Sequence, residues 1–346
     1  MTGFVKVRWS WLLMASILCL GLAFLYLGCS SDTTDTTTTG GSGGNTNIQV
    51  NWSVTAQKSG VETSLFEIFV EPTSGKLWVV GDKGVILNSS DKGTTWTKQD
   101  SGGEIAFQSA FFVSDQEGWV AGDGGTVMHT KDGGAKWEKQ NTGISEKIRG
   151  IFFSNSSEGW AVGDGGKIIN TKDGGVAWNP QASKTNQPLE AVSFSKPGPG
   201  QVLITNGWAA GGGGVIAHTS DSGTNWTIQP SKLTDPIYGI YFDSESKGWA
   251  AGKSGTILNT SNGGLTWNQS AAAAAQGKNL YDIFFLNAAT GWTVGSGGKI
   301  LYSTDGKNWN AMENKATKAL WGVAFPNANE GWAVGDEGSI LYIKKL

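Results

Sequence analysis

Carboxylates stand in several apolar segments of the sequence, where they could carry out chemistry. Glu67, Glu190 and Asp282 are three such residues. Two carboxyl groups that flank a glycosidic bond are the machinery of glycoside hydrolysis. Nothing in the spacing of these residues singles out one pair, so we favour solvated side chains at the mouth of a channel and keep a catalytic pair as the alternative.

Residue types that can hold a metal or a cofactor occur in the sequence, but they belong to stretches that are repeated along the chain. Aspartates lie in glycine-rich "GDxG" stretches, but calcium needs about six or more oxygen ligands and no D-x-D-x-D run supplies them. The only histidines, His129 and His218, occupy the same position in two similar stretches and are too few for a zinc site. Glycine runs such as "GGGG" (211–214) lack the strand–loop–helix context of a nucleotide site. We therefore expect neither metal nor cofactor.

Tryptophans mark a repeat of about 40 residues that begins near residue 48. One series is Trp78, Trp119, Trp160, Trp208, Trp249, Trp292 and Trp332. A second series is Trp96, Trp137, Trp178, Trp226, Trp267 and Trp309. Each unit contains an apolar segment, a short strand around "GWAVG", a glycine-rich turn, a third strand and a fourth that opens with tryptophan. Four short strands in about 40 residues are typical of a β-propeller blade.

The ends of the chain complement each other. Seven apolar first strands are present, but the last unit stops at "GSILYIKKL" without its fourth strand. The segment "NWSVTAQKSG" (51–60) matches a fourth strand and would complete that unit, and such closure removes open sheet edges. The sequence therefore predicts an all-β, seven-bladed propeller of four-stranded blades over residues 48–346, with a surface loop at 195–201.

Residues 1–28 have the layout of a bacterial lipoprotein signal peptide. Lys6 and Arg8 form a basic start, an uncharged apolar run follows at 9–27, and Cys29 comes directly after a glycine. The arrangement resembles signals in which this cysteine is lipidated and becomes the first residue of the mature protein. An uncleaved membrane helix is the alternative, because the apolar run is nearly long enough to span a bilayer.

Residues 29–47 are rich in Ser, Thr and Gly and contain no large apolar side chain. Such a segment cannot bury a core, so we expect a flexible tether between the lipid on Cys29 and the propeller. The protein is then exported and lipid-anchored in a bacterial cell envelope. Ser30 and Ser31 follow the cysteine, in place of the aspartate that retains some lipoproteins at the inner membrane, which mildly favours the outer membrane.

Two resemblances rest on the repeated motif. "TKDGGAKW" (130–137) fits the Asp box, or bacterial neuraminidase repeat, S/T-x-D-x-G-x-x-W. That box implies a structural hairpin turn away from any active site. The longer stretch "EGWAVGDGGKIINTKDGGVAW" (158–178) resembles the photosystem II assembly factor family, which implies an exported seven-bladed propeller that binds a client protein.

Arginine content limits what these resemblances imply. Photosynthetic members of the assembly factor family carry an arginine-rich patch that binds their client, whereas Arg149 is the only arginine after residue 28. Photosystem assembly is therefore not favoured. Sialidases need three arginines for the substrate carboxylate, and lysine does not replace that bidentate geometry, so a sialidase is excluded.

The second residue of each first strand varies from blade to blade. If first strands surround the axis, these side chains converge near one mouth, where they would form a binding rim for a peptide or sugar. The alternative is that the aromatic ones pack between blades. The candidate rim consists of Phe66, Gln108, Arg149, Glu190, Tyr238, Tyr281 and Trp321.

The formal net charge of −3 lacks the basic footprint of a nucleic-acid binder. We predict a monomeric, non-catalytic, membrane-tethered scaffold for protein–protein interaction that assists assembly of an envelope complex. A carbohydrate-binding or carbohydrate-cleaving propeller, with polysaccharide as the partner, is the alternative.

Overall fold

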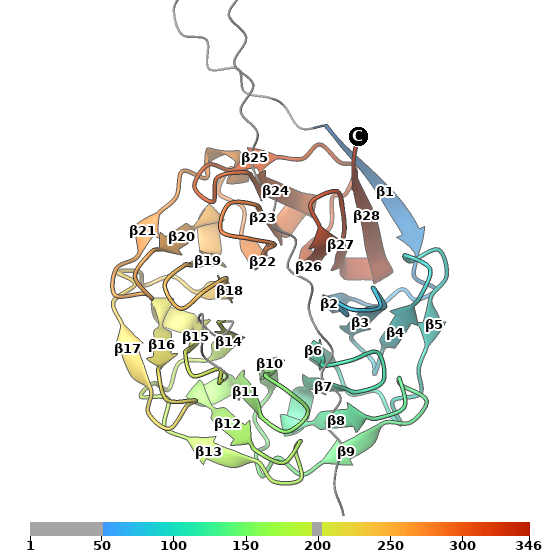
Figure 1. The fold of residues 1–346 in the computed structure, drawn as a ribbon. Helices are drawn as coiled ribbons and strands as arrows, with labels where there is room; N and C mark the ends of the chain where they lie inside the picture. The colour runs from blue at the N-terminus through green and yellow to red at the C-terminus, as the bar shows by residue number, and fades with distance from the viewer. Residues whose placement is uncertain (1–50, 196–202) are drawn as a thin grey trace, which may run out of the picture. The chain divides into compact units, whose positions relative to one another are not determined.

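Seven four-stranded antiparallel sheets surround a common axis in the computed structural model, which describes residues 51–195 and 203–346 (Figure 1). Cys29, the tether and nearly all of the expected loop at 195–201 lie outside the described residues. We number the blades from the chain's first complete sheet. Blade 1 holds β2–β5, blades 2 to 6 follow with four strands each, and blade 7 combines β26, β27 and β28 with β1.

The strands occupy equivalent positions in each blade. The innermost are β2 (Leu65–Val70), β6 (Phe107–Phe112), β10 (Ile148–Phe153), β14 (Leu189–Phe194), β18 (Ile237–Phe242), β22 (Leu280–Phe285) and β26 (Leu320–Asn327). The second are β3 (Leu77–Gly81), β7 (Gly118–Gly122), β11 (Gly159–Gly163), β15 (Gly207–Gly211), β19 (Gly248–Gly252), β23 (Gly291–Gly295) and β27 (Glu330–Gly335).

The remaining strands lie toward the periphery. The third are β4 (Ile86–Ser89), β8 (Val127–Thr130), β12 (Ile168–Thr171), β16 (Ile216–Thr219), β20 (Ile257–Thr260), β24 (Lys299–Ser303) and β28 (Ser339–Lys345). The outermost are β5 (Thr97–Lys98), β9 (Glu138–Gln140), β13 (Asn179–Gln181), β17 (Thr227–Gln229), β21 (Asn268–Gln269), β25 (Asn310–Ala311) and β1 (Trp52–Lys58).

Short 3₁₀ turns are the only helical elements among the described residues. They are η1 (Asp123–Gly125), η2 (Asp164–Gly166), η3 (Gly212–Gly214), η4 (Lys253–Gly255), η5 (Ala273–Ala275), η6 (Ser296–Gly298) and η7 (Asp336–Gly338). Six of the seven join the second and third strands of a blade. None of the helices in the described part of the chain has the length and apolar character needed to cross a membrane.

Blade 7 closes the ring with strands from both ends of the domain. β1 pairs antiparallel with β28 along its whole length, from Trp52 opposite Lys345 to Lys58 opposite Ser339. The two strands lie side by side at the edge of the ring (Figure 1). The predicted seven-bladed architecture, with the N-terminal strand completing the last blade, is confirmed.

A stacked tryptophan–phenylalanine pair joins most neighbouring blades. The tryptophan comes from the second strand of one blade and the phenylalanine from the end of the next blade's innermost strand. These pairs are Trp78–Phe112, Trp119–Phe153, Trp160–Phe194, Trp208–Phe242, Trp249–Phe285 and Trp292–Phe325, with ring centroids 3.4–4.2 Å apart. At the seventh joint Trp332 is equally buried, but Val70 of blade 1 replaces the phenylalanine.

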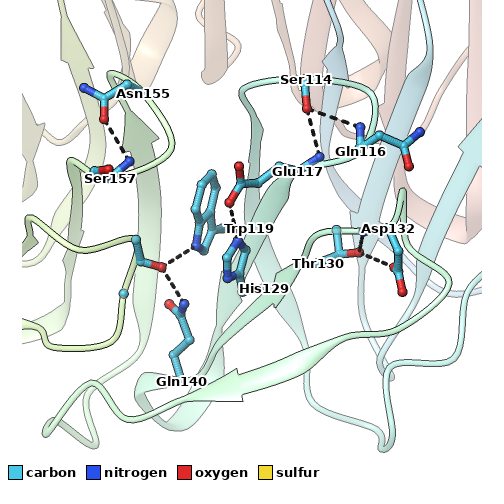
Figure 2. Close-up of polar contacts among 12 residues, drawn as sticks. Ser114, Gln116, Glu117, Trp119, His129, Thr130, Asp132, Gln140, Asn155 and Ser157 are labelled. Carbon is cyan, nitrogen blue, oxygen red and sulfur yellow. Dashed lines mark hydrogen bonds and ion pairs between the residues drawn. The ribbon is translucent and has the colours of Figure 1, made fainter. Parts of the chain in front are cut away.

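The Asp box of one blade is fastened to the blade before it. Figure 2 shows the joint between blades 2 and 3, where Trp119 Nε1 and Gln140 Nε2 both donate to the carbonyl oxygen of Gly174, at 3.2 and 2.7 Å. Within each box the side chains form the turn, as where Thr130 Oγ1 donates to Asp132 Oδ1 at 2.9 Å. The box thus serves blade-to-blade contact and has a structural role here.

The turn after each second strand requires glycine at one position only. In η2, Gly165 has φ of 64° with open space around it, and Lys83, Ser254 and Glu337 hold the equivalent position with positive φ in other blades. Gly166 has φ of 71°, and a Cβ there would overlap the carbonyl oxygen of Thr185. The chain leading to the next blade therefore passes directly against this glycine.

We expect Gly166→Ala to lower the free energy of unfolding by about 3 kcal/mol or more, because it combines left-handed strain with a forced backbone contact. The matched Gly165→Ala carries only the strain, about 1 kcal/mol. Guanidinium denaturation of both variants measures the difference. Equal losses in the two variants would contradict the assigned backbone contact.

Candidate functional site

Every innermost strand contains a β-bulge at its second residue. In β10, Ile148 pairs with Gly163 and Gly150 with Val162, which leaves Arg149 without a partner on β11. The same shift occurs in β2, β6, β14, β18, β22 and β26. Bulges redirect side chains and are frequent beside functional sites. The seven bulge residues are the candidate rim: Phe66, Gln108, Arg149, Glu190, Tyr238, Tyr281 and Trp321.

The rim lies on the face that carries the glycine-rich turns. Leu65, which precedes Phe66, pairs with Gly81 at the end of β3, and the turn after β3 begins where Asp82 N donates to Ser64 O at 2.9 Å. All seven rim side chains are partly exposed. The aromatic ones also contact one another from blade to blade, as the alternative to a binding rim supposed.

Four aromatic rim residues form a continuous arc across blades 5, 6, 7 and 1. Tyr238 meets Tyr281 edge-on with centroids 5.4 Å apart, and Tyr281 stacks on Trp321 at 4.1 Å. Trp321 contacts Phe66 edge-on at 6.2 Å. We call these four residues the aromatic arc. Each supplies one ring from a different innermost strand, so the arc exists only when the blades are assembled.

A hydrogen bond positions the indole of the arc. Trp321 Nε1 donates to Asp336 Oδ1 at 2.7 Å, and Ser64 Oγ donates to the same oxygen at 2.9 Å. Asp336 belongs to η7, and Ser64 immediately precedes β2. The carboxylate that holds the indole is therefore itself hydrogen-bonded to the neighbouring blade.

The opposite part of the rim is charged. Arg149 Nε donates to Asp164 Oδ1 at 2.6 Å, and its Nη1 donates to Glu190 Oε2 at 3.0 Å. Burial raises the pKa of the Glu190 carboxyl, and Arg149 offsets part of that rise. Gln108 stands on β6, between β10 and β2. The single rim cation is thus engaged by two carboxylates.

Two carboxyl groups lie one residue further along the strands of the arc. Asp282 Oδ1 accepts from Ile283 N at 2.7 Å, and its Oδ2 accepts from Val323 N of blade 7 at 2.9 Å. Burial raises the pKa of Asp282 to about 6 in spite of these hydrogen bonds. Burial and the charge of Asp282 together hold the pKa of Glu67 well above its usual range.

Gly322 separates these two carboxyl groups. A Cβ at Gly322 would lie 3.0 Å from Glu67 Cα, so the strands approach closely there. Glu67 and Asp282 are surrounded by protein, yet each keeps some accessible surface, which lets water reach them. Sequence reasoning named both residues, together with Glu190, but did not single out this pair.

Two of the aspartates in the "GDxG" stretches contact rim residues. Asp164 holds Arg149 and Asp336 holds Trp321, whereas Asp123 pairs with Lys147 at 2.9 Å. The sequence indicated these contacts only in part, because the "GDxG" aspartate is absent from blades 4, 5 and 6.

The histidines pack against tryptophans away from the rim. His129 stacks on Trp119 with centroids 4.4 Å apart and contacts Glu117 Oε1 at 3.1 Å (Figure 2). His218 stacks on Trp208 at 4.9 Å. Burial lowers the pKa of both imidazoles. Within residues 51–195 and 203–346, no group of three or more His, Cys, Asp and Glu could hold a metal ion.

Comparisons with known proteins agree with this architecture. A family model described as photosynthesis system II assembly factor YCF48 matches residues 45–150, 135–235 and 232–304. No curated protein matches the chain.

Solved structures with low sequence identity share the fold. YCF48 from Cyanidioschyzon merolae is 20% identical with a TM-score of 0.68, over 84% of this chain and 98% of that one. A structure of YCF48 bound to D1 peptide is 18% identical with a TM-score of 0.68, over 85% and 99%. Virginiamycin B lyase from Staphylococcus aureus is 14% identical with a TM-score of 0.68, over 86% and 100%.

The carboxyl pair makes stability depend on pH. Because the folded pKa values of Glu67 and Asp282 are raised, the folded protein keeps protons that the unfolded chain releases near pH 4. The stabilisation from these protons is complete below about pH 4. The contribution of Asp282 is lost as the pH rises through about 6, and that of Glu67 is lost as the pH rises through its own raised pKa. We expect Glu67→Gln to match the unmodified protein near pH 4 and to be more stable than it near pH 7.5.

Denaturation by guanidinium at a series of pH values measures this effect. The exposed Glu62→Gln serves as the control and should leave the pH profile unchanged. Parallel profiles for Glu67→Gln and the unmodified protein would contradict the raised pKa of Glu67.

Proposed function

Because the chain belongs to the photosynthesis system II assembly factor YCF48 family, we propose that it is a non-catalytic protein-binding propeller that assists assembly of a complex in the cell envelope. The observation that carries the proposal is the aromatic arc, four partly exposed rings gathered at one mouth of the ring. Exposed aromatic clusters are characteristic of the residues that dominate binding energy at protein interfaces.

The related structures favour a protein as the ligand. One of them is the structure of YCF48 bound to D1 peptide, and the match with the present chain covers 99% of that YCF48 chain. For the present chain we propose a protein segment that docks on the rim. A photosystem client is not part of the proposal, because Arg149 is the only arginine after residue 28 and two carboxylates already engage it.

The proposed location rests on the sequence of the N-terminal part, which lies outside the described residues. The signal-like segment 1–28, the lipidation candidate Cys29 and the tether at 29–47 support a lipid anchor in a bacterial envelope, with the outer membrane preferred. A tethered propeller could present its rim to partners at the same membrane.

A carbohydrate-cleaving function is the second candidate, and the carboxyl pair is the observation that favours it. A carboxyl with a raised pKa beside a second carboxyl is the arrangement of many glycosidases. Against this, both oxygens of Asp282 accept hydrogen bonds from backbone N–H groups, which leaves them poorly placed to act on a substrate.

Crosslinking in cells followed by affinity capture and mass spectrometry tests the proposal. We expect a defined envelope protein with the tagged chain and its loss with the combined variant Tyr238→Ala, Tyr281→Ala and Trp321→Ala. The matched control replaces three exposed apolar residues outside the rim: Val176→Ala, Ile228→Ala and Leu265→Ala.

The control should retain the partner, and circular dichroism of both variants checks that the fold is preserved. Recovery of polysaccharide in place of protein would favour the second candidate. Equal capture of the partner by both variants would indicate that the docking site lies outside the rim.

A further inference from the structure

We propose that the outer edge of blade 7 is a docking site for the same edge of a second copy of this chain. The two β1 strands pair antiparallel and join their blades into one continuous sheet. This docking site is separate from the proposed function, because it lies at the periphery of the ring and leaves the rim free. The chain is then a dimer, in contrast to the monomer predicted from the sequence.

β1 is the longest of the outermost strands. It has seven residues, whereas the outermost strands of the other blades have two or three. It stands at the end of its sheet, at the edge of the ring (Figure 1), and within residues 51–195 and 203–346 no strand other than β28 pairs with it. A long unpaired strand edge presents a row of backbone N–H and C=O groups to which another strand can bind.

Proline and charged side chains are the usual means by which edge strands avoid such pairing. β13 of blade 3 carries Pro180, opposite Ile169 of β12. The corresponding residue of β1 is Ala56, opposite Leu341 of β28, and in both strands this residue directly precedes a glutamine. The only charged residue of β1 is Lys58, at its end. The edge of β1 is therefore unprotected along most of its length.

The pairing of β1 with β28 determines which backbone groups remain available. Leu346 N donates to Asn51 O at 3.0 Å, so the backbone groups of Asn51 point toward β28. Successive residues of a strand direct these groups to opposite sides. Those of Val54 and Ala56 therefore point away from β28, whereas those of Thr55 point toward it.

A two-fold axis at Thr55 satisfies these outward groups and suits the side chains. Val54 then faces Ala56 of the second copy and exchanges backbone hydrogen bonds with it, and Thr55, which is exposed, faces Thr55 of the second copy. Lys58 faces Trp52, whose ring attracts a cation, and the two lysines lie at opposite ends of the paired strands. Because the edge complements itself in hydrogen bonding and in charge, a second copy is the occupant that fits it.

Cysteine crosslinking tests the docking site by mild oxidation of intact cells that produce the full chain. Thr55→Cys places two cysteines opposite each other at a pair without mutual hydrogen bonds, where the Cα atoms are about 4.5 Å apart, a distance that a disulfide bridges. We expect a disulfide-linked dimer on a non-reducing gel and its loss on reduction. The unmodified chain, which contains Cys19 and Cys29, gives the background.

Ser53→Cys is the matched control on the same strand. In the two-fold arrangement Ser53 faces Gln57 of the second copy, so the two introduced cysteines lie roughly 13 Å apart, too far for a disulfide. We expect no dimer above the background from this variant.

Ala56→Pro separates docking from folding. It removes an N–H that points away from β28, and Pro180 shows that blade 3 accommodates proline at the corresponding position. Combined with Thr55→Cys, it should abolish the disulfide-linked dimer, while the circular dichroism spectrum stays that of the unmodified chain.

Several outcomes would overturn the proposed dimer. Absence of a disulfide-linked dimer with Thr55→Cys would do so directly. Equal yields from Thr55→Cys and Ser53→Cys would indicate random collision, and a dimer that survives Ala56→Pro would indicate contact through another surface. A disulfide from position 55 to a different protein would assign the edge to another partner. The rim variants should form the same dimer, so failure of the proposed function leaves this docking site unaffected.

Discussion

Each blade is a small sheet that cannot cover its own two faces, and this constraint governs the molecule. The second-strand tryptophans are buried only because the next blade supplies a stacking partner, as Trp119 finds Phe153 at 3.6 Å. Hydrogen bonds from tryptophan and glutamine to the neighbouring Asp box align the same joint. A blade is therefore stable only between two others, and the chain must close on itself, with β1 completing blade 7.

Closure also creates the candidate site. It brings seven innermost strands together around the axis, where small residues such as Gly150, Gly239 and Gly322 let the backbones approach. The bulge just before them turns one side chain per blade toward the mouth, and this side chain differs in identity from blade to blade. The rim can therefore vary in sequence while the repeat that supports it stays constant. In this chain the variation yields the aromatic arc on one part and carboxylates around it.

The sequence was sufficient to predict the fold, because the evenly spaced tryptophans and the match of 51–60 to a fourth strand are both local patterns. The rim residues were also identifiable, since their position in the repeat is regular. Their partners were not. The bond from Trp321 to Asp336 depends on strand register, and the contact of Asp282 with Val323 joins two blades. Such contacts follow from the curvature of the closed ring, which no local pattern in the sequence encodes.

Site-specific photocrosslinking in living cells tests most directly whether the rim is the docking site. A photoreactive phenylalanine analogue would replace Tyr238 on the rim or, in a separate strain, Ile228 on the outer strand β17. The account predicts an adduct with one defined protein from position 238 and none from position 228. An adduct from the outer strand with none from the rim would contradict it.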